Sequence, residues 1–274
     1  PDGTVTTLAK ASNFSRPFAA AVGDDGTYYV STDDDPNNQG LKTPTSGTVW
    51  SVPSGGGLVA PVPIAETMWR PRGITAAAGG GVFTVSRYHN VVGYLDVASG
   101  TYTHWAGGNS GYTDGQGASA EFRSPLGAAR LPDGTYAVAD GDSATIRRVT
   151  SSGVVSTIAG VGVPGMIDGP CNMARFGTPR DVAVDAAGNI YVADGLNERI
   201  RRIRMSPSCI VETLAGSGAT GFADGPGDHA IFYGEEGLDV AADGRTVYVA
   251  VGDLGTGDAF HRIRAVSVPP LGDP

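Results

Sequence analysis

Charged side chains flank a proline that recurs along the chain, and they are the residues best placed to do chemistry. Pro17, Pro71, Pro125 and Pro179 follow one another at one constant interval. Arginine and glutamate side chains beside such a repeated position could form a mixed-charge ring that holds an anionic ligand. The members of this set are Arg16, Arg70, Arg72, Arg180, Glu235 and Glu236.

Two interpretations of this set stay open. In the one we favour, the arginines form ion pairs with Glu235 and Glu236 and have a structural role. In the other, Arg72, Arg180 and Glu236 serve a small-molecule hydrolase or lyase. The spacing assembles no Ser-His-Asp or Cys-His set, so we predict no catalytic residue.

A metal site is not expected, with one weak exception. Of the four histidines, only His89 and His229 fall in suitable loops, which is too few for a three-histidine site. An acidic loop beginning at Asp33 offers the oxygen ligands that calcium requires, but Pro44 stands where an EF-hand needs its glutamate. We therefore predict no cofactor, and keep calcium as an alternative at Asp33, Asp35 and Asn37.

The elements that position these residues repeat along the whole chain. A turn and a strand at 133–140 recur at 187–194, and the strand Thr145–Val149 recurs at Arg199–Ile203, which is the interval of the prolines. Charged and apolar residues alternate in these third strands, which predicts one solvent-exposed face. With 42 Gly and 18 Pro to form turns, the repeat predicts an all-β, five-bladed β-propeller of four-stranded blades. The blades are expected at about 18–65, 73–107, 127–160, 181–216 and 237–267.

The ends of the chain are expected to close the ring. The last blade lacks its own fourth strand, because the sequence passes into a Pro-rich stretch at 269–274. Thr4–Ala9 has the pattern of Val154–Ala159, the fourth strand of the third blade. We therefore expect residues 4–9 to complete the last blade, so that residues 1–268 form one domain and the Pro-rich stretch begins a linker or tail.

The best repeats resemble a known family. Phe176–Asp185, Gly188–Asp194 and Asn197–Arg201 together look like an NHL repeat. The resemblance implies a propeller whose channel mouth carries the proline-flanking charges. NHL propellers usually have six blades, whereas this chain has room for five. Some members bind RNA through a basic face, and some NHL-like propellers are metal-dependent lyases or hydrolases with channel-facing histidines, a pattern that this chain does not match.

A second recurring feature is a loop between blades that carries an apolar residue and an Asp-Gly pair. The three copies lie at 111–115, 165–169 and 221–225. They form either a contact surface for a protein or a glycan, or simple turns whose apolar residues pack between blades. The candidate binding surface comprises Trp69, Tyr112, Asp114, Met166, Asp168, Phe222 and Asp224.

The composition of the chain limits the classes of partner that it could bind and the cellular compartment in which it could act. The net charge of −9 and a pI of about 4.8 argue against a nucleic-acid surface, and no apolar run is long enough to span a membrane. Lysine is scarce, Asn13 begins a glycosylation sequon, and Cys171 and Cys209 permit one disulfide. Simple propeller topology places these cysteines at opposite faces, so a bridge requires the long loop to fold down the side of its blade.

These observations favour a non-catalytic interaction or structural module, outside the cell or at its surface and within a larger protein or assembly. Its partner would be a protein or a glycan, or further copies of itself. A small-molecule hydrolase or lyase at the channel mouth is the alternative.

Overall fold

The structure is a computed structural model that describes residues 17–32, 47–57, 59–63, 68, 70–252 and 262–270, apart from the side chains of Glu235 and Glu236. The chain falls into two compact units, Pro1–Trp105 and Ala106–Pro274, and each is described by itself. Several predicted features lie outside the described residues: the strand at 4–9, Asn13, Arg16, Asp33, Asp35, Asn37 and Trp69.

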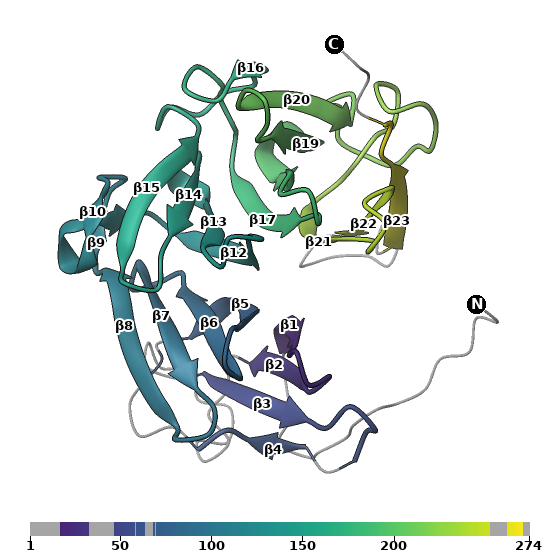
Figure 1. The fold of residues 1–274 in the computed structure, drawn as a ribbon. Coiled ribbons are helices and arrows are strands. Elements are labelled where there is room, and N and C mark those ends of the chain that lie inside the picture. Colours follow the sequence, from purple (N-terminus) through teal and green to yellow (C-terminus); the bar gives the residue numbers. More distant parts are fainter. Residues whose placement is uncertain are drawn as a thin grey trace. The chain divides into compact units, whose positions relative to one another are not determined.

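The fold is an all-β, five-bladed β-propeller, as the repeat predicts. The described residues contain no α-helix, and their only helical turns are three short 3-10 segments, Gly117–Ser119, Gly141–Ser143 and Gly195–Asn197. Two blades lie in the first unit and three in the second (Figure 1).

Each blade of the first unit is a four-stranded antiparallel sheet in which strands pair in chain order. Tyr29, Val49, Ile74, Val82 and Leu95 are buried in the core that the two sheets share. The strands are β1 (Pro17–Val22), β2 (Tyr28–Thr32), β3 (Thr48–Val52) and β4 (Ala60–Pro61), then β5 (Pro71–Ala77), β6 (Gly81–Ser86), β7 (Val91–Asp96) and β8 (Thr101–Gly107).

The second unit holds the three remaining blades and a larger core around Ile146, Phe176, Ile190 and Ile203. Its third blade contains β12 (Pro125–Arg130), β13 (Tyr136–Asp140), β14 (Thr145–Val149) and β15 (Val154–Ala159). The fourth blade of the propeller contains β17 (Pro179–Val184), β18 (Ile190–Asp194), β19 (Arg199–Arg204) and β20 (Ile210–Ala215). The fifth blade contains β21 (Glu235–Val240), β22 (Thr246–Val251) and β23 (Arg262–Ser267).

The repeated prolines each begin the first strand of a blade, a place where the missing N–H group does no harm. A register shift follows directly after each of them. Within each unit the first strands of neighbouring blades lie together, as β12 does with β17 and β17 with β21.

The loops between blades add strands that the sequence did not reveal. β10 (Gly115–Gln116) pairs with β15, and β16 (Gly169–Pro170) pairs with β20, so the third and fourth sheets have five strands. A second short pair, β9 (Asn109–Ser110) and β11 (Glu121–Phe122), closes the loop before the third blade. These loops therefore run down the outer edge of the following blade.

The prediction that the charged residues of the third strands form a solvent-exposed face is wrong. Arg147 in β14 and Arg201 in β19 have no exposed surface, and Arg202 and Arg264 are also buried. Burying a guanidinium group in this way is costly unless it is paired and hydrogen-bonded. The two Nη atoms of Arg147 meet this condition, whereas its buried Nε has no hydrogen-bond partner among the described residues. The partners of Arg147, Arg201 and Arg264 belong largely to the loops between blades.

Candidate functional site

A buried arginine fastens each inter-blade loop of the second unit to the blade that follows it. In the third blade, Arg147 forms ion pairs with Asp114 at 2.7 Å and with Asp140 at 3.2 Å. It also donates to the backbone carbonyls of Thr113 and Glu121, at 3.1 and 2.9 Å. One guanidinium thus joins β14, the end of β13 and two points of the loop, and we call this arrangement an arginine clamp.

The same clamp recurs in the next two blades. Arg201 pairs with Asp168 and, at 3.0 Å, with Asp194, and it donates to the carbonyls of Ile167 and Arg175. In the fifth blade, Arg264 pairs with Asp224 at 2.7 Å and donates to two loop carbonyls, but Val251 occupies the position of the buried aspartate.

The loop aspartates of the candidate surface are therefore engaged within the protein. Asp114 also accepts hydrogen bonds from the backbone and hydroxyl groups of Thr157, and Asp168 accepts one from the backbone of Thr213. Their carboxylates hold the loop on the outer strands of the blade. Their side chains stay partly exposed, at 51% for Asp114 and 43% for Asp168, so these aspartates and the exposed apolar residues of the loops both face outward.

Burial sets the protonation of the inner aspartates. Loss of hydration raises the pKa of Asp140 to about 7, against the opposing effects of the Arg123 backbone N–H and of Arg147. The pKa of Asp194 is raised for the same reason, although Asn197, Arg201 and Gly177 donate to it. A perturbed carboxyl can mark a catalytic site, but both of these carboxyls are fully buried inside clamps.

The loop between the third and fourth blades carries the exposed apolar side chains of Val163, Met166, Ile167 and Met173, the last of them 64% exposed. Tyr112 on the preceding loop is 48% exposed, and its ring lies against Gly162 of this loop. We call Tyr112, Val163, Met166, Ile167 and Met173 the loop patch.

The third predicted apolar residue, Phe222, differs from Tyr112 and Met166. Its ring is half-buried beneath the guanidinium groups of Arg262, at 3.8 Å, and Arg264, at 4.9 Å. This packing corresponds to the structural role that the sequence left open for all three positions. Val163, Ile167 and Met173 were missed, although the run of large apolar residues between 163 and 173 was a signal for them.

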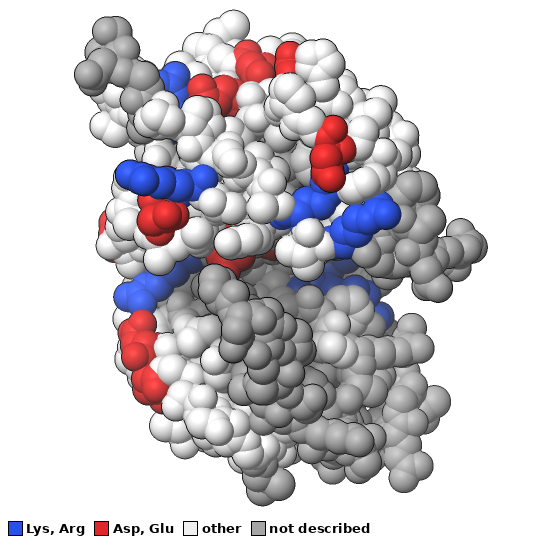
Figure 2. Space-filling model, turned by 90° about the vertical axis from the view of Figure 1, so that its right-hand side faces the viewer, with Lys and Arg blue, Asp and Glu red and all other residues white. Residues whose placement is uncertain are grey.

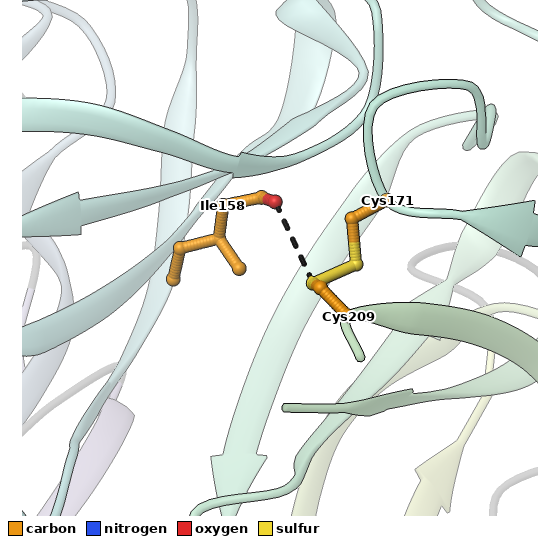
Figure 3. Close-up of a disulfide and its surroundings, with 3 residues drawn as sticks. All are labelled: Ile158, Cys171 and Cys209. Atoms are coloured by element: carbon orange, nitrogen blue, oxygen red, sulfur yellow. Dashed lines mark hydrogen bonds between the residues drawn. A yellow bond between two sulfur atoms is a disulfide. The ribbon is translucent and has the colours of Figure 1, made fainter. Parts of the chain in front are cut away.

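The loop patch is anchored by a disulfide. Cys171 and Cys209 are bridged (Figure 3), with their Cα atoms 5.4 Å apart. The Cys171 N–H also donates to the Cys209 carbonyl at 3.1 Å. β16 brings Cys171 down beside β20, which is the loop path that a bridge requires. Figure 3 also shows the Cys209 sulfur facing the carbonyl oxygen of Ile158, so the bridge lies between the third and fourth blades.

We expect removal of this bridge to lower the free energy of unfolding by about 3 kcal/mol, because it closes a loop between cysteines 38 positions apart in sequence. Urea unfolding of a Cys171→Ser/Cys209→Ser variant, with and without a reducing agent, measures this. The wild-type protein should lose stability on reduction, and the variant should not respond. Equal stability of the reduced and oxidised wild type would contradict the expectation.

The proline-flanking charges are divided between the two units and the residues outside the described part of the chain. Arg70 and Arg72 belong to the first unit, whereas the Arg180 side chain in the second unit lies against the backbone of Gly195. The side chains of Glu235 and Glu236 are outside the described part of the chain, as is Arg16. The ion pairs predicted for the two glutamates therefore stay a prediction.

Arg70 and Arg72 contact aromatic rings. The guanidinium carbon of Arg72 lies 3.5 Å from the centre of the Phe18 ring, and that of Arg70 lies 4.5 Å from the centre of the Tyr88 ring. Arg72 and Arg87 approach the Tyr88 ring as well, at 5.9 and 5.7 Å. We call Phe18, Arg70, Arg72, Arg87 and Tyr88 the arginine–aromatic cluster. Phe18, Arg87 and Tyr88 were not predicted, but the absence of any acidic residue from 67 to 95 was a signal.

Outside this cluster, positively and negatively charged side chains are interspersed with each other. On the described part of the face that Figure 2 draws, blue Lys and Arg side chains lie interspersed with red Asp and Glu side chains among white ones. Among the described residues no three His, Cys, Asp or Glu side chains lie together as metal ligands would. No helix in that same part of the chain is long and apolar enough to cross a membrane.

Solved structures resemble the chain in fold. An auxiliary nutrient binding protein from Bacteroides ovatus aligns with a TM-score of 0.68 at 18% identity, covering 94% of this chain and 60% of that one. Virginiamycin B lyase from Staphylococcus aureus gives 0.55 at 13%, covering 93% and 70%. A putative gluconolactonase gives 0.59 at 15%, covering 98% and 83%.

These likenesses establish a β-propeller fold that serves different activities. The chain spans about three fifths of the length of the first solved structures that it matches. Its sequence matches no protein-family model and no curated protein. Function must therefore be argued from the site, because one fold hosts many functions.

Proposed function

We propose that the chain is a non-catalytic binding module of the NHL type, which acts outside the cell or at its surface and contacts a protein or glycan through the loop patch. The observation that carries this proposal is the arginine clamp. It engages the half-exposed loop carboxylates Asp114 and Asp168 in ion pairs with buried arginines and fixes the loops, so that Tyr112 and Met166 are displayed on a rigid support.

Two further observations support the proposal. The disulfide between Cys171 and Cys209 fits an oxidising compartment. Solved structures similar in fold include auxiliary nutrient binding proteins from Bacteroides species.

The proposal is tested by charging the loop patch. A Met166→Asp/Met173→Asp variant should bind its partner about tenfold more weakly or worse, because buried apolar anchors dominate interface energies. Binding is measured on arrays of purified glycans and secreted proteins, and self-association by sedimentation velocity. Val154→Asp is the matched control, since Val154 is an exposed apolar residue of the same unit outside the patch.

Loss of binding in the patch variant alone supports the proposal. Equal loss in the Val154→Asp control contradicts it, and so does a wild-type protein that stays monomeric at high concentration and binds nothing on either array.

The alternative is a small-molecule hydrolase or lyase at the channel mouth, with Arg72, Arg180 and Glu236 as its residues. One observation favours it: Arg72 belongs to a cationic cluster with exposed rings, and proteins of similar fold include a lyase and a putative gluconolactonase. If the protein turns over a lactone or a streptogramin and Arg72→Gln abolishes this turnover, the enzyme hypothesis replaces the binding-module hypothesis.

A further inference from the structure

Two of the four methionines of the chain are exposed, and both lie in the loop patch. Met173 is 64% exposed and Met166 is 43% exposed. Met68 is buried in the core of the first unit, and Met205 is partly buried against the larger core of the second unit. The thioether groups that a solute can reach are therefore concentrated on the surface that we propose for binding.

The repeat does not require sulfur at either position. The two other inter-blade loops of the second unit carry different residues there: Tyr112 and Phe222 in place of Met166, and Ser119 and His229 in place of Met173. The exposed thioethers are thus a property of the loop between the third and fourth blades alone, and not of the fold.

A thioether reacts with a hydroperoxide without any further reactant. The lone pair of the sulfur attacks the O–O bond, one oxygen atom is transferred to the sulfur, and hydrogen peroxide loses its other oxygen as water. The sulfur is oxidised by two electrons and the peroxide is reduced by two. The product, methionine sulfoxide, is polar where methionine is apolar, and reductases can return it to the thioether.

The loop is held by groups that this reaction leaves unchanged. The backbone N–H and carbonyl groups of Ile167 pair with those of Arg175, at 3.3 and 3.0 Å, and the N–H of Met173 donates to the Pro170 carbonyl at 2.8 Å. The disulfide and the arginine clamp of the fourth blade hold the same loop. Among the described contacts that fix the loop, none uses the side chain of Met166 or Met173, so oxidation changes the polarity of the surface and leaves its support in place.

We propose that Met166 and Met173 form an oxidation site, through which a hydroperoxide converts the loop patch from an apolar to a polar surface. The consequence for binding rests on the proposed function: oxidation at this site releases the partner. A sulfoxide oxygen that enters an apolar interface loses its hydration and gains no hydrogen bond there. The disulfide between Cys171 and Cys209 fits an oxidising compartment, in which such a change of the surface would be of use.

The experiment treats the full chain with hydrogen peroxide at neutral pH and follows sulfoxide formation at each methionine by peptide mapping with mass spectrometry. We expect Met166 and Met173 to be oxidised about tenfold faster than Met68, and also faster than Met205. Retention on a phenyl resin measures the exposed apolar surface without any partner, and it should fall on oxidation. Thermal unfolding of the oxidised protein verifies that the fold is kept.

Met166→Leu/Met173→Leu is the matched control, because leucine keeps both side chains apolar and of similar volume but has no sulfur to oxidise. On the arrays of glycans and secreted proteins this variant should bind as the wild type does, before and after peroxide treatment. The oxidised wild type should bind about tenfold more weakly.

The oxidation site is overturned if Met68 or Met205 is oxidised as fast as the loop methionines, or if oxidation leaves the retention of the wild type unchanged. Release of the partner is overturned if the oxidised wild type binds as before, or if peroxide weakens binding by the leucine variant equally. A wild type that binds nothing on the arrays contradicts the proposed function, whereas peptide mapping and retention still decide the oxidation site. Failure of the two proposals is therefore distinguishable.

Discussion

Replacing Arg147 by methionine is expected to lower the free energy of unfolding by about 3–5 kcal/mol, because it leaves the buried Asp140 carboxyl without its cationic partner. Arg147 has no exposed surface and is the ion-pair partner of Asp140, which is equally buried. The Glu121 carbonyl loses its Arg147 donor at the same time, and the Thr113 carbonyl keeps only the N–H of Glu121. Urea unfolding followed by circular dichroism measures the change.

The neighbouring arginine on the same strand supplies the control. Arg148 pairs with Asp133 at 2.7 Å, but both side chains are partly exposed, so Arg148→Met should cost about 1 kcal/mol or less. Adding Asp140→Asn to Arg147→Met should recover part of the lost stability, because the unpaired charge is removed. If the two arginine variants are equally stable, the clamp does not hold the blade together.

The second large effect is expected at the N-terminus, through the strand predicted at 4–9. β23 is the last strand of its sheet among the described residues, and Ile263 on it is 72% exposed. If Thr4–Ala9 supplies the fourth strand in the register of Val154–Ala159, Val5 takes the place of Val155, which is 1% exposed. Val5→Asp should then lower the free energy of unfolding by about 3 kcal/mol, the sum of lost apolar burial and a desolvated charge.

Thr6→Asp is the matched control for that substitution. Thr6 takes the place of Ser156, which is exposed in the third blade, and its replacement should be nearly neutral. Deleting residues 1–9 should destabilise the protein at least as much as Val5→Asp. Equal stability of Val5→Asp, Thr6→Asp and the wild type would show that these residues do not complete a blade.

The blades were predictable because their turns and first strands repeat at a fixed interval. Pro125 and Pro179 mark the same backbone position, and the strands Tyr136–Asp140 and Ile190–Asp194 occupy the same place in the third and fourth sheets. The burial of the third-strand arginines was not predicted from alternation, because a charged residue in a strand is ordinarily read as facing water. The usable signal was that Asp114 and Asp168 each precede a third-strand arginine by the same separation in sequence.

The weak repeats of the first unit also have a physical explanation. In the first blade the position of Arg147 is taken by buried Trp50, whose indole N–H donates to Thr32 at 2.9 Å. In the second blade that position is Gly93, and the space above it is filled by the hydroxyl of Tyr102, 3.0 Å from the hydroxyl of Thr84. Different side chains thus fill the same space in different blades, so the repeat is hard to recognise in the sequence of the first unit.

The candidate sites were less accessible to sequence reasoning than the fold. Phe18 and Tyr88 are far apart in the sequence, and only the pairing of β1 with β2 and the packing of β1 against β5 bring them to one place. The loop aspartates are exposed as predicted, but no local pattern reveals that a distant guanidinium donates to each of them. Both sites are formed by contacts between residues that are far apart in the sequence.

Within each inter-blade loop of the second unit, the clamp holds some residues in place and leaves others out of its contacts. The aspartate and two carbonyls that Arg147 or Arg201 holds are fixed by the framework, whereas the exposed side chains of Val163 and Met166 stand outside the described clamp contacts. Such side chains can vary with little penalty in folding. A chain built in this way can acquire new partners by changing a few exposed side chains, and the same positions offer places to graft designed recognition sequences onto an unchanged propeller.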